Sequence, residues 1–181
     1  MVDEIIEDPA GRKIGGRRET VTVLMSDLRG FTSISEAMDA EDVVQLLNRF
    51  LERMTNIIVG YDGMIDEFIG DAILAVFGVP EKKEDDAARA VACALSMQNV
   101  LKELNDEMIA EDCPVLEMGI GINTGSVIVG NIGSEVRTKY GIVGTVINRA
   151  ARIESNTVGG EVLLGEETYR PVRDFVTVHV P

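Results

Sequence analysis

Two aspartates lie next to apolar runs, where a carboxylate could take part in chemistry. Asp27 stands near the end of TVTVLMSDL, and Asp71 follows Gly70 between the runs IDEFI and AILAVF. If the strands that carry them are neighbours in a sheet, the two carboxylates come close together, and their repulsion favours a divalent cation between them. Mg²⁺ is typically held by one or two carboxylates with substrate phosphates and water. The simpler interpretation is a hairpin turn at Gly70-Asp71 whose aspartate faces water.

The residues after Asp27 offer a place for a phosphate. The stretch RGFT, residues 29–32, combines a glycine with an expected helix start. The first N–H groups of a helix have no acceptor within the helix, so they can bind a phosphate. Two divalent ions beside such a turn can activate an attacking oxygen and stabilise a leaving one. The combination favours phosphoryl chemistry.

A third group of side chains lies in TVINRAARIESN, which we expect to be helical. Asn148 and Arg152 are spaced i, i+4 there and therefore share one helix face. A neutral donor and a fixed cation on one face can hold a ribose oxygen and a developing phosphoryl charge. A solvated helix face explains the same spacing equally simply. Arg149 points elsewhere and is expected at the surface.

Composition limits the possible partners. The chain has 181 residues, of which 45% are hydrophobic, and a net charge of −14. This charge disfavours nucleic acid and anionic membrane surfaces as partners. Cys93 and Cys113 stand in no metal or redox spacing and are interpreted as reduced thiols. No apolar run approaches the length of a spanning helix and no signal peptide opens the chain, so a cytoplasmic location is expected.

The elements that must position these side chains alternate between strands and helices. A linker from an upstream region is expected at 1–17 and one domain at 18–181. Helices are expected at 41–59, 81–104 and 145–156. Strands are expected at 20–28, 65–69, 72–77, 115–125, 126–133, 159–165 and 174–180, the fourth and fifth being joined by a Thr-Gly-Ser turn. This order predicts an α/β (α+β) sandwich on a ferredoxin-like βαββαβ core with extra strands, and helices mainly on one sheet face.

Four blocks, MSDLRGFTSIS, FIGDAILAVFG, GIGINTGSVIVGNIG and YGIVGTVINRAARIES, together resemble the catalytic domain of class III nucleotidyl cyclases. The resemblance covers roughly residues 16–169. It implies that 18–181 is a cyclase catalytic domain, in which the ribose 3′-oxygen attacks the α-phosphorus to give a 3′,5′-cyclic nucleotide and pyrophosphate. It also implies a head-to-tail homodimer with two composite active sites, and regulatory domains upstream in the parent chain.

The resemblance also suggests roles for the residues named above. Asp27 and Asp71, with the backbone carbonyl of Leu28, match the ligands of two Mg²⁺ or Mn²⁺ ions per site. Asn148 and Arg152 match the pair that the other subunit contributes to orient the ribose and stabilise the transition state. The phosphate-contacting turn is matched by Gly30, Phe31 and Thr32.

The base that the enzyme reads is predicted from Glu67. Family members that use ATP usually carry Lys at the matching position, and those that use GTP usually carry Glu. Guanine presents two adjacent donors, N1–H and the 2-amino group, and an ionised carboxylate only accepts. Adenine N1 is an acceptor, so Glu67 would face it without a hydrogen bond, at a cost of ~1–3 kcal/mol. The sequence therefore predicts a guanylate cyclase with GTP as its substrate.

Gly141 departs from the family pattern. The residue after Tyr140 is usually Asp or Thr in adenylate cyclases and often Cys in animal guanylate cyclases. Glycine can neither accept from adenine N6 nor donate to guanine O6, so discrimination is expected to depend mainly on Glu67. Two further interpretations remain open at this point. One is an adenylate cyclase whose pocket recruits another residue, and the other is an inactive dimerisation or regulatory module with a cyclase fold.

Two family cations also have no match. Family members usually carry a Lys beyond the last strands that contacts the phosphates, and the sequence ends at Pro181 before such a residue. Ser126 stands where some heterodimeric cyclases place a cation after a Thr-Gly pair. Arg137 and Lys139 are the candidates to meet that charge.

Overall fold

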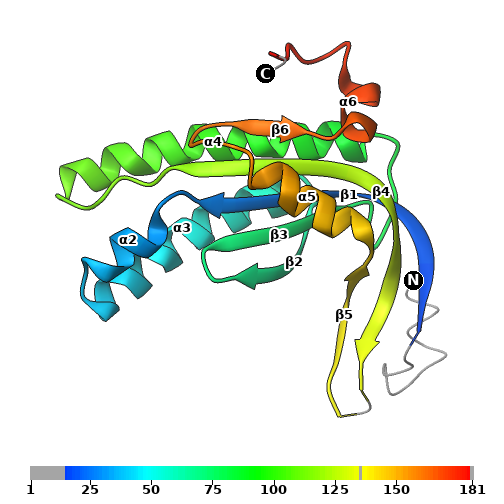
Figure 1. Cartoon of the computed structure of the whole chain (residues 1–181), viewed down its shortest axis with the longest axis horizontal. Coiled ribbons are helices and arrows are strands. Elements are labelled where there is room, and N and C mark those ends of the chain that lie inside the picture. The colour runs from blue at the N-terminus through cyan, green and yellow to red at the C-terminus, as the bar shows by residue number, and fades with distance from the viewer. Residues whose placement is uncertain (1–14, 135, 180–181) are drawn as a thin grey trace.

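The structure, a computed structural model, describes residues 15–134 and 136–179. At its centre is a six-stranded sheet with the path β2-β3-β1-β4-β5, and β6 pairs with β4 beside this path (Figure 1). All pairs are antiparallel except β4 with β6, which is parallel. The strands are β1 Gly15–Leu28, β2 Met64–Ile69, β3 Ala72–Phe77, β4 Met118–Gly133, β5 Thr138–Val143 and β6 Val162–Leu164.

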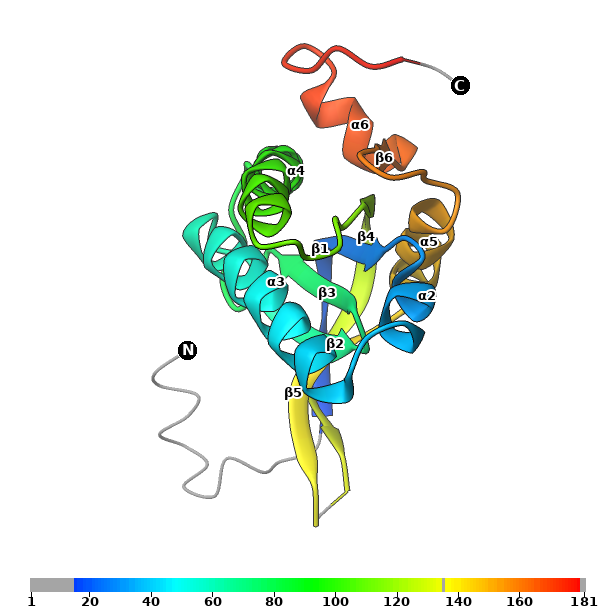
Figure 2. The ribbon, with the colours of Figure 1, turned by 90° about the vertical axis from the view of Figure 1, so that its left-hand side faces the viewer.

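Helices cover both faces of this sheet. The helices are α2 Phe31–Glu36, α3 Ala40–Gly60, α4 Asp86–Ala110, α5 Thr145–Glu154 and α6 Glu166–Val172. The two long helices, α3 and α4, lie together on one face, and α5 lies on the other (Figure 2). The predicted α+β fold is confirmed. The expectation that helices lie mainly on one sheet face is met only by α3 and α4, because α5 covers the other face.

Two apolar clusters hold these layers together. On α3, Leu46, Phe50, Met54 and Ile58 recur at intervals of four and are all buried against the sheet and α4. All six residues of β3 are buried, as expected of a central strand covered on both faces. Burying one large apolar side chain contributes ~1.5–3 kcal/mol, so these clusters dominate the stability of the fold. The ends of β1 and β3 are therefore fixed in place.

The long strands differ from the sequence expectation. Residues 115–133 were expected as two strands joined at Thr124-Gly125-Ser126, but β4 runs without interruption through this point. The reason is its partner: β1 pairs with β4 in one continuous register from Gly15 opposite Asn131 to Leu28 opposite Met118. The end of β4 pairs antiparallel with β5 instead, and these two strands extend as an arm away from the helices (Figure 1).

The elements near both ends of the described residues also differ from the expectation. Because β1 begins at Gly15, the boundary expected after residue 17 falls inside a strand, and the rest of the expected linker lies outside the described residues. The strand expected at 159–165 is present as β6. The strand expected at 174–180 is absent from the described part, 174–179, because these residues have no strand partner there and Phe175 is exposed. Helix α6 precedes them.

No helix among residues 15–134 and 136–179 combines the length and the apolar character needed to cross a membrane.

Candidate active site

Asp27 and Asp71 meet where β1 ends and β3 begins. The two strands pair antiparallel with Ser26 opposite Ile73, so the positions beyond this pair remain adjacent. The backbone N–H of Leu28 donates to Asp71 Oδ2 at 3.2 Å. The hairpin turn before Asp71 is also as predicted, with Gly70 at a φ of 65°. The expectation that neighbouring strands bring the two carboxylates together is confirmed.

The negative charge of this pair of carboxylates is only partly compensated by Arg29. Burial raises the pKa of the Asp27 carboxyl, the charge of Asp71 raises it further, and Arg29 only partly opposes them. The guanidinium Nη1 of Arg29 lies 3.6 Å from Asp27 Oδ1. A divalent cation would remove this repulsion, and oxygen ligands suit Mg²⁺ and Mn²⁺.

Few side chains near this pair could bind a metal ion, and this limits the kind of metal site that they could form. Among the described residues, no group of three or more His, Cys, Asp or Glu side chains is placed to hold a metal ion. Two carboxylates and the Leu28 carbonyl would therefore need phosphate and water to complete the coordination shell. Mg²⁺ is commonly bound in this way. The residues present thus fit an ion that arrives with a phosphorylated substrate.

Arg29 connects this pair to the end of α5. Its Nη2 donates to the Glu154 carbonyl at 2.9 Å and to Thr157 Oγ1 at 2.7 Å, and it forms an ion pair with the Glu154 carboxylate. Burial raises the pKa of Glu154; Arg29 opposes this, and the charges of Asp27 and Asp71 add to it. Sequence reasoning missed Glu154, because nothing in ARIES distinguishes a buried glutamate from an exposed one.

The turn expected to bind phosphate is followed by a helix, as predicted. Gly30 is left-handed, with φ 68° and ψ 15°, and α2 begins at the next residue. The N–H groups of Ser33 and Ile34 donate to the Gly30 carbonyl at 3.0 and 3.2 Å. The amides of Phe31 and Thr32 precede these bonds and need other acceptors. Because the Phe31 side chain is buried in the core, this residue can offer a ligand only its backbone.

Asn148 and Arg152 lie on the exposed face of α5, and no contact of their side chains with the two carboxylates is recorded among the described residues. Helix α5 buries Val146 and Ala150 against the sheet and exposes both Asn148 and Arg152. The structure records no side-chain hydrogen bond or ion pair of either residue with the described part of the chain. The chain thus brings Asp27 and Asp71 together and leaves Asn148 and Arg152 available at the surface.

The two residues predicted to read the base lie near each other. Glu67 on β2 has 56% of its side chain exposed, and Lys139 Nζ on β5 lies 3.6 Å from Glu67 Oε2. The same Nζ lies 2.9 Å from Asp66 Oδ2. Gly141 on β5 is buried against Asp66, since a Cβ added there would lie 2.6 Å from Asp66 Oδ1. Asp66 was missed because it precedes Glu67 on a strand, where a neighbour normally faces the other side.

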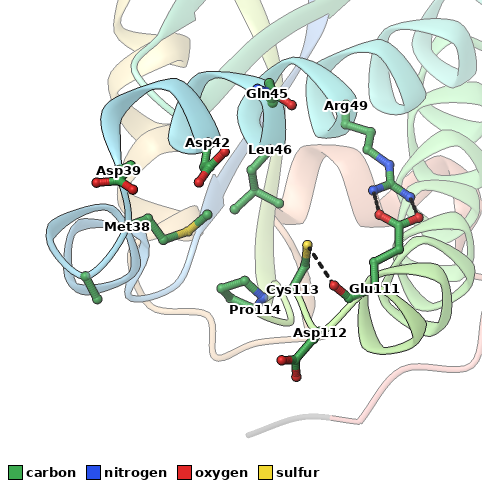
Figure 3. Close-up of a pocket in the computed structure, with 11 residues that line it drawn as sticks. Met38, Asp39, Asp42, Gln45, Leu46, Arg49, Glu111, Asp112, Cys113 and Pro114 are labelled. Atoms are coloured by element: carbon green, nitrogen blue, oxygen red, sulfur yellow. Dashed lines mark hydrogen bonds and ion pairs between the residues drawn. The ribbon is translucent and has the colours of Figure 1, made fainter.

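A pocket of about 580 Å³ lies elsewhere, between the start of α3 and the end of α4 (Figure 3). Asp39, Asp42 and Leu46 line it from one side and Cys113 from the other. The Arg49–Glu111 ion pair lies at its edge (Figure 3). None of the predicted site residues lines this pocket. We therefore place the candidate site at the carboxylate pair and not in this hollow.

Nearly the whole chain is similar to proteins of known structure or family. The family model described as the adenylate and guanylate cyclase catalytic domain matches residues 15–179. The crystal structure of the guanylyl cyclase Cya2 is similar over 87% of this chain and 80% of that chain, with 52% identity and a TM-score of 0.84. That of the adenylyl cyclase CyaB from P. aeruginosa is similar over 91% and 85%, with 38% identity and a TM-score of 0.87.

Curated relatives are longer. Adenylate cyclase 1 of Rhizobium meliloti (strain 1021) is 31% identical over 167 residues, which cover 90% of this chain and 25% of that protein. The chain spans about a quarter of the length of the curated relatives it matches. These similar proteins are named as guanylyl cyclases in some cases and as adenylyl cyclases in others.

Proposed function

The chain belongs to the family of adenylate and guanylate cyclase catalytic domains, the class III nucleotidyl cyclases, and on this premise we propose that it converts GTP to 3′,5′-cyclic GMP and pyrophosphate. The observation that carries the choice of base is Glu67. More than half of its side chain is exposed on β2. Lys139 contacts both Glu67 and Asp66, and Asp66 in turn lies against Gly141. Glu67 is therefore accessible to a nucleotide base.

The hydrogen-bonding pattern of guanine matches this carboxylate. Guanine N1–H and its 2-amino group both donate, and an ionised Glu67 accepts both. Adenine N1 would face Glu67 as a second acceptor, and Gly141 has no side chain to accept from adenine N6. An unpaired polar group in a closed pocket costs ~1–3 kcal/mol, which corresponds to roughly ten- to a hundredfold in affinity. The 52% identity with a guanylyl cyclase supports the same choice.

In the proposed site, Asp27, Asp71 and the Leu28 carbonyl hold two Mg²⁺ or Mn²⁺ ions. When bound, such ions neutralise the triphosphate and favour ionisation of the ribose 3′-hydroxyl. The backbone at Gly30, Phe31 and Thr32 holds the phosphates, in agreement with the family resemblance and with the left-handed turn that precedes α2. The net charge of −14 makes these ions more important, because the protein as a whole repels a polyanion.

The remaining groups come from a second copy of the chain. The side chains of Asn148 and Arg152 are exposed and, within the described residues, make no hydrogen bond or ion pair in their own chain. In a head-to-tail homodimer, Asn148 orients the ribose of the partner's nucleotide, and Arg152 stabilises the charge that develops on the transferred phosphorus. Each dimer then has two composite sites.

Initial rates with GTP and with ATP, each in Mg²⁺ and in Mn²⁺, test this proposal. We expect cyclic GMP to form well above cyclic AMP in both metals. Cyclic AMP in excess would show that the base is set by residues other than Glu67. If neither nucleotide reacts, the domain keeps the fold for interaction alone. An Asp71→Asn variant is the negative control, because it removes one proposed ligand and leaves the base pocket intact.

A further inference from the structure

A buried carboxylate fills the space that a side chain at position 141 would occupy. Only 6% of the Asp66 side chain is exposed. Its Oδ1 is buried and has no hydrogen-bond partner among the described residues. The same Oδ1 would lie 2.6 Å from a Cβ at Gly141, closer than any real contact of this kind allows. Asp66 can adopt this position only because residue 141 is glycine.

A β-bulge explains how Asp66 reaches this position. The pairing of β2 with β3 shifts register between Ile65 and Glu67, so Asp66 is the extra residue. In a regular strand, Asp66 and Glu67 would point to opposite faces. The bulge turns both toward Lys139, whose Nζ lies 2.9 Å from Asp66 Oδ2 and 3.6 Å from Glu67 Oε2. Bulges commonly re-aim side chains in this way.

Lys139 has the right place to contact a base. It stands two residues before Gly141 on β5 and therefore projects from the same face of the strand. Its Cε would lie 3.6 Å from a Cβ at Gly141, so its stem passes over the glycine. About half of the side chain, 48%, remains exposed. The ammonium group is thus anchored on one side and open to a ligand on the other.

We propose that Asp66 is a positioning residue of the base pocket: it takes the place of the absent side chain at position 141 and holds the Lys139 ammonium as a donor to the 6-oxo group of the purine. This inference deepens the proposed function, since it assumes that the base lies against Glu67. Lys139 and Glu67 then present a donor beside an acceptor. Guanine presents the complementary order, with O6 accepting and N1–H and the 2-amino group donating.

Adenine fits this pair poorly at both positions. Its 6-amino group donates and would face the ammonium donor, and its N1 accepts and would face the Glu67 carboxylate. The pocket therefore does not depend on Glu67 alone. Asp66 itself does not touch the base, because it is buried beneath Lys139 and Gly141.

The test compares kcat/KM for GTP, ITP and ATP in Lys139→Ala, Asp66→Asn and the double variant. ITP retains the 6-oxo group and N1–H of GTP but lacks the 2-amino group. Lys139→Ala should lower kcat/KM for GTP and ITP by about tenfold, the effect of one lost charged hydrogen bond, and leave ATP unchanged or improved. Asp66→Asn should also lower kcat/KM for GTP and ITP, by a smaller factor.

The double variant isolates the positioning role. With Lys139 already replaced, Asp66→Asn should change the GTP-to-ATP ratio no further, because Asp66 acts only through that lysine. Lys139→Arg, which keeps a cationic donor, should restore most of the preference. The matched control is Lys102→Ala, which removes an exposed lysine from α4. Melting temperatures of all variants identify any that fail to fold. If Asp66→Asn fails, Lys139→Ala, at an exposed position, still tests whether the ammonium group contacts the 6-oxo group.

Three results would overturn the inference. An equal loss with all three nucleotides would mean that Lys139 contacts the phosphates or the fold and does not read the base. No loss with any nucleotide would remove Lys139 from the pocket, and a further fall in the double variant would exclude Asp66 as a positioning residue. The ratio of kcat/KM for GTP to kcat/KM for ATP in the wild type tests the proposed function. The change in this ratio on substitution tests Asp66 and Lys139 separately.

Discussion

Asp27 carries a charge that the fold opposes when no metal is bound. Because its pKa is raised by burial and by Asp71, the folded state favours the protonated form, and stability falls as pH rises through the folded pKa. Ionisation of this carboxylate therefore lowers the stability of the folded state. Binding of a divalent ion, as proposed, would offset this cost.

Asp27→Asn should separate these two effects. In the presence of a chelator at pH 7.5, we expect the variant to melt about 1–2 °C above the wild type, a small shift because the side chain is partly exposed. Divalent ions should raise the melting temperature of the wild type and have little effect on the variant. Cyclase activity should fall by at least about a hundredfold, because one proposed ligand is lost. Differential scanning fluorimetry with and without Mn²⁺ measures the first two effects.

Asp106→Asn on α4 is the matched control, since it removes an exposed carboxylate far from the pair. It should leave both the melting temperature and its response to Mn²⁺ unchanged. A variant of Asp27 that melts below the wild type in chelator would show that its ion pair with Arg29 outweighs the repulsion.

At the residue scale, the sequence predicts groups that lie at strand ends and misses groups that are positioned by irregular backbone. Asp27 and Asp71 were paired correctly because apolar runs mark β1 and β3. Asp66 was missed because no sequence pattern reveals the bulge between Ile65 and Glu67. Glu154 was missed because its burial depends on Arg29, which reaches it across the fold.

At the scale of elements, the C-terminal end of α5 is attached to the β1 turn by one side chain. Arg29 contacts Glu154 and Thr157 and lies over Gly119, where a Cβ would collide with its guanidinium. Glu154 has 10% of its side chain exposed and would lose its cation if Arg29 were shortened. This attachment also fixes the orientation of the helix that carries Asn148 and Arg152.

We expect Arg29→Ala to lower the free energy of unfolding by about 2–3 kcal/mol, because it leaves a buried carboxylate without its partner. Urea unfolding measures this change. The control is Arg170→Ala, whose ion pair with Glu166 on α6 is exposed and should contribute little to stability. Equal effects of the two substitutions would mean that Arg29 has no special part in holding α5.

Glu154→Gln provides a pH test of the same contact. Burial holds the pKa of Glu154 above its ordinary value of 4.5, so the folded state binds its proton more tightly than the unfolded chain. The stability of the wild type should then decline as pH rises from 4.5 through the folded pKa. Gln keeps an acceptor for Arg29 and cannot ionise, so this part of the decline should disappear.

Urea unfolding at a series of pH values compares the two proteins, with Glu103→Gln, an exposed glutamate of α4, as the control. The control should follow the wild-type curve. An unchanged slope in Glu154→Gln would show that Arg29 compensates fully for the buried charge.

Which elements form was predicted better than where they end. The helices expected at 41–59, 81–104 and 145–156 are present as α3, α4 and α5, and turn residues identified the β2–β3 hairpin. The division of β4 into two strands was wrong because Thr124-Gly125-Ser126 is a turn signal that continuous pairing with β1 overrides. The strand at 174–180 was wrong in its described part because alternation of apolar residues there is not matched by a neighbouring strand.

At the scale of the whole molecule, the single chain provides half of each proposed site. Asp27 and Asp71 form one half, and the exposed Asn148 and Arg152 form the other. The pocket between the start of α3 and the end of α4 is lined by none of them (Figure 3). A site made at an interface explains both observations, since a groove between two copies is open in either copy alone. Symmetry then requires two equivalent sites per head-to-tail dimer.

Mixing two inactive chains tests this arrangement. An Asp27→Asn chain and an Arg152→Ala chain should each form dimers in which every site lacks one essential group. When they are co-expressed, random pairing makes half of the dimers mixed, and each mixed dimer has one site with both defects and one with none. Activity should therefore recover to about a quarter of the wild-type value.

Arg149→Ala is the control for the second chain, because Arg149 is the exposed neighbour of the proposed catalytic pair and points away from it. Dimers of this variant alone should be active. If the mixture of Asp27→Asn and Arg152→Ala chains remains as inactive as its components, while size-exclusion chromatography shows mixed dimers, each site must be built within one chain. Recovery near a quarter excludes that arrangement, because only a site shared between two copies can place both defects together and leave its twin intact.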